Sequence, residues 1–199
     1  MRTTSFLRFC FASHTRYCIV GLGSGGLSLT SHLLRSGIHP SEIRVIDPAP
    51  KHYYQPGWTM VGAGLWNILS TEASMEEVTP KDITFSKDRL KLVKPDENKV
   101  VCESGQEYTY DELILGTGFK LQYEKVQGLK EALDDPNSNV ASIYELKYAE
   151  KVAKLGEKLT SGKAIFTEPA LPIKCAGAPQ KILYLWSDKW QKKNLPVSV

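Results

Sequence analysis

The sequence predicts an α/β protein, and three features near the N-terminus predict it. Residues 17–20 are rich in strand-forming types and lead into a Gly-x-Gly-x-x-Gly turn at residues 21–26. A helical pattern of leucines follows at once over residues 27–34. A second apolar strand at residues 43–46 ends in Asp47. This order of strand, glycine turn, helix and strand is typical of a Rossmann-like unit, so we expect a dinucleotide site here.

Each glycine of the turn has a separate physical role. Gly21 permits the tight turn off the strand, Gly23 leaves the backbone open to a pyrophosphate, and Gly26 lets the helix lie close to the strand. The free N–H groups and positive dipole end of the helix then favour phosphates. Asp47 follows the last glycine by about twenty residues, where a carboxylate accepts from ribose hydroxyls. The alternative is a plain β–turn–helix with an incidental acid.

Composition narrows the class of protein. The chain has 199 residues and a formal net charge of +3, with no basic cluster that would indicate nucleic-acid binding. No apolar run is long enough for a transmembrane helix. The cysteines have neither zinc-site spacing nor a Cys-x-x-Cys pair, so we predict no metal site and mostly ordinary reduced thiols. They are Cys10, Cys18, Cys102 and Cys175.

The N-terminal segment, residues 1–16, is rich in arginine and hydroxyl residues and contains no acid; the first acidic residue is Glu42. This composition is typical of a mitochondrial transit peptide, and the alternative is a disordered basic arm. We therefore expect a transit peptide over 1–16, a nucleotide-binding domain over 17–140, and the start of a second Rossmann-like domain over 141–199.

The first half of the chain continues with a helix that ends at Gly37 in the C′ role. The loop that follows Asp47 carries Tyr53, Tyr54 and Trp58 around Gln55. These aromatic rings are either core residues or a lining for a flat ligand. A short helix over residues 61–69 comes next.

Residues 71–81 read as a polar surface segment. Short extended pieces with turns between them then predict a β-meander at residues 83–85, 90–93, 100–102 and 108–110. A buried strand at residues 113–115 leads into a second small-residue turn, residues 116–118, which is either a cofactor contact or a plain loop. Residues 119–139 are mostly loop.

Two helices and a strand are predicted in the last part of the chain. Ser142 and Glu145 have capping-box spacing before an amphipathic helix. Residues 163–167 form a strand, and Pro179 suits the first position of the last helix.

Cys175 is the one candidate for a reactive thiol. It lies just before this last helix, with Lys174 beside it and Lys181 one turn on. A helix N-terminus and nearby cations make a cysteine more nucleophilic. The alternative is a small apolar residue without a chemical role, as for most free cysteines.

Four segments together resemble the mitochondrial, animal-type sulfide:quinone oxidoreductases, and the resemblance covers residues 17–186. They are GLGSGG, HYYQPGWTMVGAG, LILGTG and AIFTEPALPIKCAGAPQKILYL. The second and fourth are much more specific than the glycine motif. The resemblance implies a Rossmann-like FAD-binding domain with a β-meander, in the two-dinucleotide-domain flavoprotein superfamily. It also implies oxidation of hydrogen sulfide to a cysteine persulfide, transfer of the sulfur to glutathione or sulfite, and passage of two electrons through FAD to ubiquinone.

The family's functional residues carry over to matching positions. Cys175 matches the first of two redox cysteines, so the resemblance implies that it is catalytic. The implied chemistry is attack of sulfide on a bridge between the two cysteines, followed by electron donation to the flavin. The resemblance implies that the flavin contacts, besides Gly21, Gly23 and Gly26, are Ser24 and Gly25 at the pyrophosphate, Asp47 at the ribose, Gln55, Leu90 at the adenine end, and Thr117.

One departure concerns length. The family's chains are much longer, and their second redox cysteine and the part that docks on the inner mitochondrial membrane come after the region matched here. We therefore expect a truncated form with an incomplete second domain, which cannot complete the catalytic cycle. One alternative is another FAD- and NAD(P)H-dependent reductase of the superfamily, which predicts a second Gly-x-Gly-x-x-Gly motif that the sequence lacks. Another is an inactive isoform that binds FAD.

Overall fold

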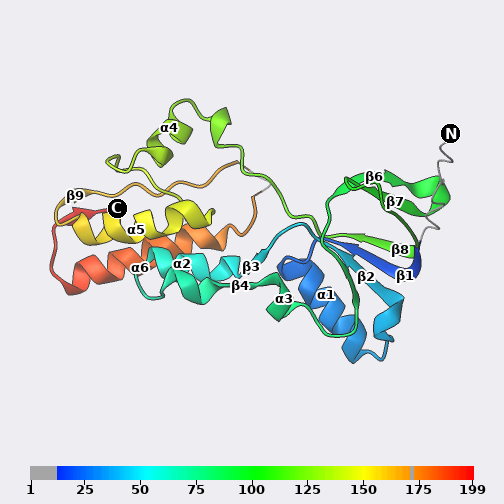
Figure 1. The fold of residues 1–199 in the computed structure, drawn as a ribbon. Helices are drawn as coiled ribbons and strands as arrows, with labels where there is room; N and C mark the ends of the chain where they lie inside the picture. The colour runs from blue at the N-terminus through cyan, green and yellow to red at the C-terminus, as the bar shows by residue number, and fades with distance from the viewer. Residues whose placement is uncertain (1–12, 171–172) are drawn as a thin grey trace, which may run out of the picture. The chain divides into compact units, whose positions relative to one another are not determined.

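The chain folds into two compact units in the computed structural model, which describes residues 13–170 and 173–199 (Figure 1). The first unit takes the chain up to His52 and then Ala73–Phe119. The second unit takes Tyr53–Glu72 and Lys120–Val199. The chain therefore leaves the first unit, enters the second and returns before it finally crosses over.

The first unit is built on a six-stranded sheet with the order β5-β2-β1-β8-β7-β6. The first four of these strands are parallel to one another, whereas β6, β7 and β8 form an antiparallel meander. The strands are β1 (Ser13–Val20), β2 (Ile43–Ile46), β5 (Thr84–Ser86), β6 (Leu90–Lys94), β7 (Lys99–Cys102) and β8 (Glu107–Leu115). Two small sheets pair β3 (Lys51–Tyr53) with β4 (Glu72–Ser74), and β9 (Gly162–Lys163) with β10 (Val197–Ser198).

Helices are distributed over both units. In the order of the chain they are α1 (Ser24–Arg35), α2 (Trp58–Gly62), α3 (Met75–Val78), α4 (Leu129–Asp134), α5 (Leu146–Lys158) and α6 (Gly177–Lys192). Short 3₁₀ turns are found at Pro40–Glu42, Gln55–Gly57, Ile68–Thr71, Pro95–Glu97 and Tyr123–Lys125. The predicted end of α1 is confirmed, because Gly37 follows the C-cap residue Ser36 with φ +87°.

The parallel strands of the first unit are buried on both faces, which is why they read as continuous apolar runs. Ile19 and Val45 belong to the cluster that α1 covers, together with Leu22 and Met75. Alternate residues of the same strands belong to the opposite cluster, which the meander supplies with further side chains. That cluster contains Cys18, Val20, Ile46, Val100, Cys102 and Tyr110.

The predicted meander differs from the observed one at both ends. Residues 83–85 do not join it: β5 lies at the parallel edge of the sheet, where Val45 is paired with Phe85. The two expected strands at 108–110 and 113–115 are one strand, β8, because nothing between them breaks the chain. Its first part pairs with β7, and nearly its whole length pairs with β1.

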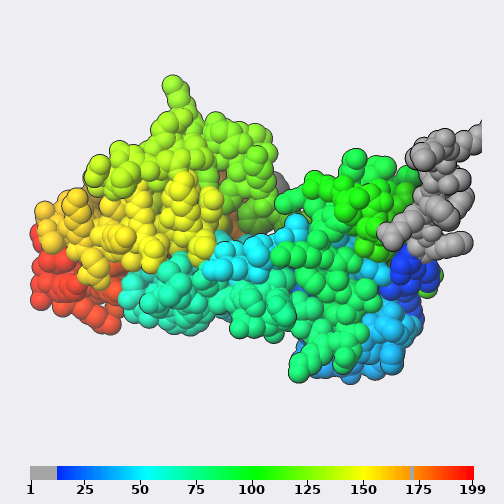
Figure 2. All heavy atoms as spheres, viewed as in Figure 1, coloured from blue at the N-terminus to red at the C-terminus, as the bar shows by residue number. Residues whose placement is uncertain are grey.

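The core of the second unit is formed by α2, α5 and α6. In Figure 2 the atoms of α2 lie against those of α5, although the two helices are far apart in the sequence. The rings of Trp186 and Trp190 stack with centroids 5.6 Å apart. The indole N–H of Trp186 donates to the carbonyl of Gly62 at 2.9 Å, and that of Trp190 to the carbonyl of Gly156 at 3.0 Å. These two bonds tie α6 to α2 and to α5.

Several predicted boundaries in the second unit were wrong. The helix expected over 61–69 ends at Gly62, and a 3₁₀ turn occupies residues 68–71. The strand expected over 163–167 is not formed: β9 is Gly162–Lys163 and shares only Lys163 with it. The helix expected after Ser142 begins at Leu146 with Glu145 as its N-cap. The hydroxyl of Ser142 instead accepts from the N–H of Tyr144 at 3.2 Å, so it starts a local turn rather than a capping box.

The segment 71–81, expected to be a polar surface stretch, contains β4 and α3. A capping box that the sequence did not predict caps the N-terminus of α3. The N–H of Glu77 donates to the Ser74 hydroxyl, and the Glu77 carboxylate accepts from the N–H of Ser74.

Most of the proposed transit peptide, residues 1–12, lies outside the described residues. The strand β1 begins at Ser13, before the expected start at Tyr17, and Ser13 already pairs with Tyr108. Over 13–170 and 173–199, no helix has both the length and the apolar character needed to cross a bilayer. The same ranges contain no group of three potential metal-binding side chains.

Candidate functional site

The glycine turn packs against neighbouring backbone so closely that two of its positions exclude a side chain. Gly21 has φ +97°, and a Cβ atom there would lie 2.3 Å from the carbonyl oxygen of Gly116. A Cβ atom on Gly26 would lie 1.8 Å from the carbonyl oxygen of Gly21. The absence of a side chain at these two glycines therefore allows the strand, the turn and the helix to pack in direct backbone contact.

The other side of the turn is open. A Cβ atom on Gly23 or Gly25 would meet nothing within 4 Å, and both residues are exposed together with Ser24. No side-chain hydrogen bond caps the N-terminus of α1. A helix N-terminus with bare backbone on its outer side fits a pyrophosphate group, so the local geometry suits the dinucleotide that the motif predicts.

Asp47 is buried at the end of β2, with only 8% of its surface exposed. One carboxylate oxygen accepts from the N–H of Leu22, in the glycine turn, at 2.6 Å, and the other accepts from the N–H of Ala49 at 2.7 Å. Asp47 therefore ties the glycine turn to the second strand. A carboxylate has further lone pairs, so these bonds leave acceptor capacity for ribose hydroxyls.

Thr117 lies beside the glycine turn. The N–H of Gly116 donates to the carbonyl of Val20 at 2.7 Å, and a Cβ atom on Gly21 would be 3.1 Å from the N of Thr117. The small-residue turn after β8 therefore adjoins the glycine turn. Leu90 lies on β6 of the same sheet and packs against the core cluster that contains Cys18.

The second unit contains Gln55 and Cys175, the other predicted site residues. Gln55 begins the 3₁₀ turn before α2, and its side-chain oxygen accepts a hydrogen bond from the ammonium of Lys174. The fold thus brings the aromatic loop to the segment that carries Cys175. Of the aromatic residues around Gln55, Trp58 is a core residue with 6% exposure, whereas Tyr54 is 51% exposed.

Cys175 is exposed in the turn before α6, which begins at Gly177 rather than at the expected Pro179. Its carbonyl oxygen accepts two hydrogen bonds, from the N–H of Ala178 at 2.9 Å and from the hydroxyl of Tyr144 at 3.2 Å. Sequence reasoning missed Tyr144, because no local pattern connects residues so far apart in the chain.

Burial shifts the pKa values of Lys174 and Tyr144, the two residues whose side chains are described around Cys175. Burial lowers the pKa of Lys174, an effect that the neighbouring Cys175 partly opposes. Burial also raises the pKa of Tyr144, and Cys175 and Glu168 raise it further. The Tyr144 hydroxyl therefore keeps its proton at neutral pH and acts as a hydrogen-bond donor.

The other two described cysteines are free thiols without access to solvent. Burial raises the pKa of Cys18 to about 12 and that of Cys102 to about 11. Because the thiolate is the reactive form of cysteine, both are inert at neutral pH.

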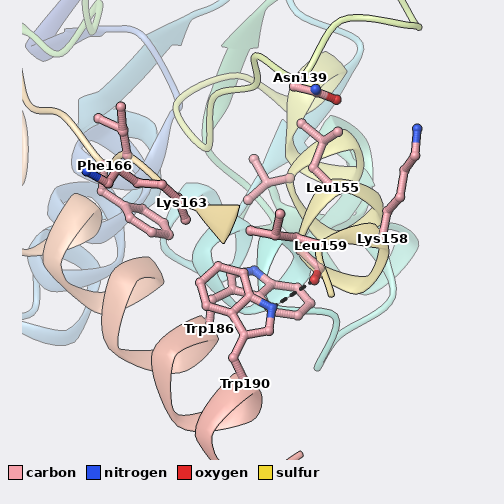
Figure 3. A pocket seen from close by; sticks show the side chains of 12 residues that line it. Asn139, Leu155, Lys158, Leu159, Lys163, Phe166, Trp186 and Trp190 are labelled. Carbon is pink, nitrogen blue, oxygen red and sulfur yellow. Dashed lines mark hydrogen bonds between the residues drawn. The ribbon is translucent and has the colours of Figure 1, made fainter. Parts of the chain in front are cut away.

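A pocket of about 340 Å³ in the second unit lies among α5, α6 and the segment after β9 (Figure 3). The rings of Phe166, Trp186 and Trp190 line it together with Leu155 and Leu159. The pocket contains none of the residues predicted to bind the cofactor.

The predicted site residues thus fall into two groups. The first unit brings together residues 21–26, Asp47 and Thr117, with Leu90 on the same sheet. The second unit brings Gln55 to the Cys175 segment through Lys174.

Comparison with known proteins identifies relatives over nearly the whole chain. No protein-family model matches it. Over 98% of its length the chain is 38% identical to the mitochondrial sulfide:quinone oxidoreductase of Schizosaccharomyces pombe, and over 87% it is 37% identical to the mitochondrial sulfide:quinone oxidoreductase of Mus musculus. These alignments cover 46% and 38% of the two relatives, so the chain spans less than half the length of each.

Solved structures show the same fold. The sulfide:quinone oxidoreductase of Aquifex aeolicus matches 94% of the chain with a TM-score of 0.67 at 22% identity, and the match covers 42% of that protein. The NADH:rubredoxin oxidoreductase of Clostridium acetobutylicum matches 93% with a TM-score of 0.52 at 16% identity, over 44% of its own chain. The predicted α/β fold class is confirmed.

Proposed function

Because the chain belongs to the sulfide:quinone oxidoreductase family and spans less than half the length of the curated relatives it matches, we propose that it provides the FAD-binding part and one redox thiol of such an enzyme. The observation that carries this proposal is the identity of 37–40% to three relatives of that name over most of the chain. The open glycine turn and the exposed Cys175 are the local features that support it.

The first unit would hold the cofactor. The backbone of Gly23, Ser24 and Gly25 would bind the pyrophosphate at the N-terminus of α1, and Asp47 would accept from the ribose. Thr117, in the turn after β8, and Leu90, on β6, would contact the rest of the cofactor. The family resemblance is what supports Gln55 as a further flavin contact. When bound, FAD supplies a two-electron acceptor.

Cys175 would take up the sulfur. A new S–S bond forms between the Cys175 sulfur and the sulfur of a hydrosulfide ion, which leaves a persulfide on the cysteine. The S–H bond of the hydrosulfide ion breaks in this step, which releases one proton and two electrons, and bound FAD would accept the two electrons. The exposed position of Cys175 gives a small anion access to the sulfur.

The partners of the whole enzyme follow from the family. We propose ubiquinone as the final electron acceptor and glutathione or sulfite as the acceptor of the persulfide sulfur. The names of the eukaryotic relatives support a mitochondrial location, and we propose a peripheral position at the inner membrane. We also propose the division of the chain. It comprises a transit peptide over residues 1–16, an FAD-binding domain over 17–140 and part of a second Rossmann-like domain over 141–199.

The cofactor proposal predicts that FAD binds to the purified chain and that Asp47→Ala weakens binding roughly 10- to 100-fold, the effect of losing charge-assisted hydrogen bonds. Titration followed by the quenching of FAD fluorescence measures this. Asp111→Ala is the matched control, because Asp111 is an exposed carboxylate on β8 of the same unit. Equal affinities for the two variants would exclude Asp47 from the site.

A further inference from the structure

Cys175 is held in a backbone conformation that its residue type does not favour. Its φ is +54°, in the left-handed region. Among the described residues, the other non-glycine residues with positive φ are Asp82, Asn98 and Asn194. Asp and Asn tolerate this region because their short polar side chains bond locally, whereas cysteine has no such help. Contacts from outside must therefore hold Cys175 in place.

The two hydrogen bonds to the Cys175 carbonyl are those contacts. The N–H of Ala178 closes the turn into α6, and the hydroxyl of Tyr144 reaches the same oxygen from the segment before α5. The cost of the left-handed conformation is comparable to the contribution of one or two such bonds. Loss of either bond is therefore enough to release the peptide toward ordinary conformations.

Tyr144 is itself fixed. Its ring packs in the core cluster that contains Ile182 and Trp186, both on α6. Its N–H donates to the hydroxyl of Ser142 at 3.2 Å, and the hydroxyls of Ser142 and Tyr123 are hydrogen-bonded at 2.9 Å. A donor anchored on both its ring and its backbone can define the position of the group that it binds.

The conformation of Cys175 decides where its sulfur lies. Lys174 directly precedes Cys175 in the chain, and its ammonium is held by a hydrogen bond to the side-chain oxygen of Gln55. A rotation about the Cys175 backbone would swing the Cα–Cβ bond away from this position.

We propose that Tyr144 is a positioning residue for the Cys175 thiol: its hydroxyl holds the Cys175 peptide in the left-handed conformation, which keeps the sulfur beside Lys174 at the start of α6. The relevance to sulfide oxidation rests on the proposed function of Cys175. Tyr144 does not contact the reacting sulfur through this hydrogen bond; it acts through the backbone.

The test compares two reagents on the same thiol, the dianionic disulfide 5,5′-dithiobis(2-nitrobenzoate) and neutral iodoacetamide. Lys174 attracts the anionic reagent only while the sulfur lies beside it. We expect Tyr144→Phe to lower the ratio of the two rate constants about five-fold, the effect of losing one close charge interaction near the surface. General loosening of the loop would change both rates together and leave their ratio unchanged.

The measurement uses the whole chain carrying Cys10→Ser. Cys18 and Cys102 are fully buried and need no substitution, so Cys175 is the thiol that reacts. The variant Cys175→Ser shows which part of the signal comes from this thiol. Ala178→Pro is the second variant: it removes the other donor to the same carbonyl, is tolerated in the first turn of a helix, and should lower the ratio in the same direction. Tyr184→Phe, an exposed tyrosine on α6, is the matched control and should leave the ratio unchanged.

Tyr123→Phe separates positioning from stability, because it removes the hydroxyl that contacts Ser142 but leaves the bond to Cys175 intact. Each rate is measured below the melting temperature of that variant. An unchanged ratio in Tyr144→Phe and Ala178→Pro, or an equal fall in Tyr123→Phe, would overturn the proposal. The experiment needs neither FAD nor sulfide. Its result therefore does not depend on whether the chain binds FAD or oxidises sulfide.

Discussion

Gly26→Ala is expected to destabilise the first unit by about 3 kcal/mol, the upper end of the usual cost of overpacking, and to abolish FAD binding. The added Cβ atom would lie 1.8 Å from the carbonyl oxygen of Gly21. That oxygen belongs to backbone and cannot rotate away, so α1 must move off the strand. The phosphate site at the N-terminus of α1 moves with it. Urea unfolding measures the loss of stability, and FAD titration measures the loss of the site.

Gly23→Ala is the matched variant for this prediction. Its Cβ atom would meet nothing within 4 Å, so the protein should remain nearly as stable as the original. The same atom stands on the open side of the turn, and we expect FAD to bind roughly 100-fold more weakly, which corresponds to about 2.7 kcal/mol. If both variants bound FAD as well as the unchanged chain, the glycine turn would not be the phosphate site.

Gly156→Ala is expected to destabilise the second unit by about 3 kcal/mol or more. A Cβ atom on Gly156 would lie 2.1 Å from the indole ring of Trp186, which is only 1% exposed and is held in place by its hydrogen bond to the carbonyl of Gly62. The carbonyl of Gly156 also accepts from the indole N–H of Trp190, so displacing α5 breaks that bond as well (Figure 3). Thermal unfolding followed by tryptophan fluorescence measures the change.

Gly177→Ala provides the comparison within the same unit. It introduces the same methyl group at the start of α6, where a Cβ atom would meet nothing within 4 Å. The midpoint temperature of its thermal unfolding should stay close to that of the unchanged chain. Similar midpoints for Gly156→Ala and Gly177→Ala would show that the contact between α5 and α6 is not tightly packed.

The sequence was sufficient to predict the parts of the fold that depend on neighbouring residues. The strand, glycine turn and helix around Gly21, and the end of α1 at Gly37, follow from local conformational preferences. The N–H groups of Leu22 and Ala49 donate to the carboxylate of Asp47, and the contact of Asp47 with ribose stays a prediction.

Features that depend on contacts distant in the sequence were not predictable in this way. The pairing of β5 with β2 and the bond from Tyr144 to Cys175 join segments that share no local pattern. The same is true of the bond between Lys174 and Gln55, which only the tertiary fold brings together. Ser142 shows the converse: its spacing to Glu145 matches a capping box, but its hydroxyl is engaged by Tyr123 and by the N–H of Tyr144.

The absorbance spectrum of the purified chain loaded with FAD, recorded before and after anaerobic addition of sulfide, shows whether the chain holds flavin and whether Cys175 reacts with sulfide. We expect the absorbance bands of bound flavin, and we expect sulfide to bleach them in the unchanged chain and much more slowly in Cys175→Ser. A colourless protein after removal of free FAD, or equal bleaching in the two chains, would contradict this expectation.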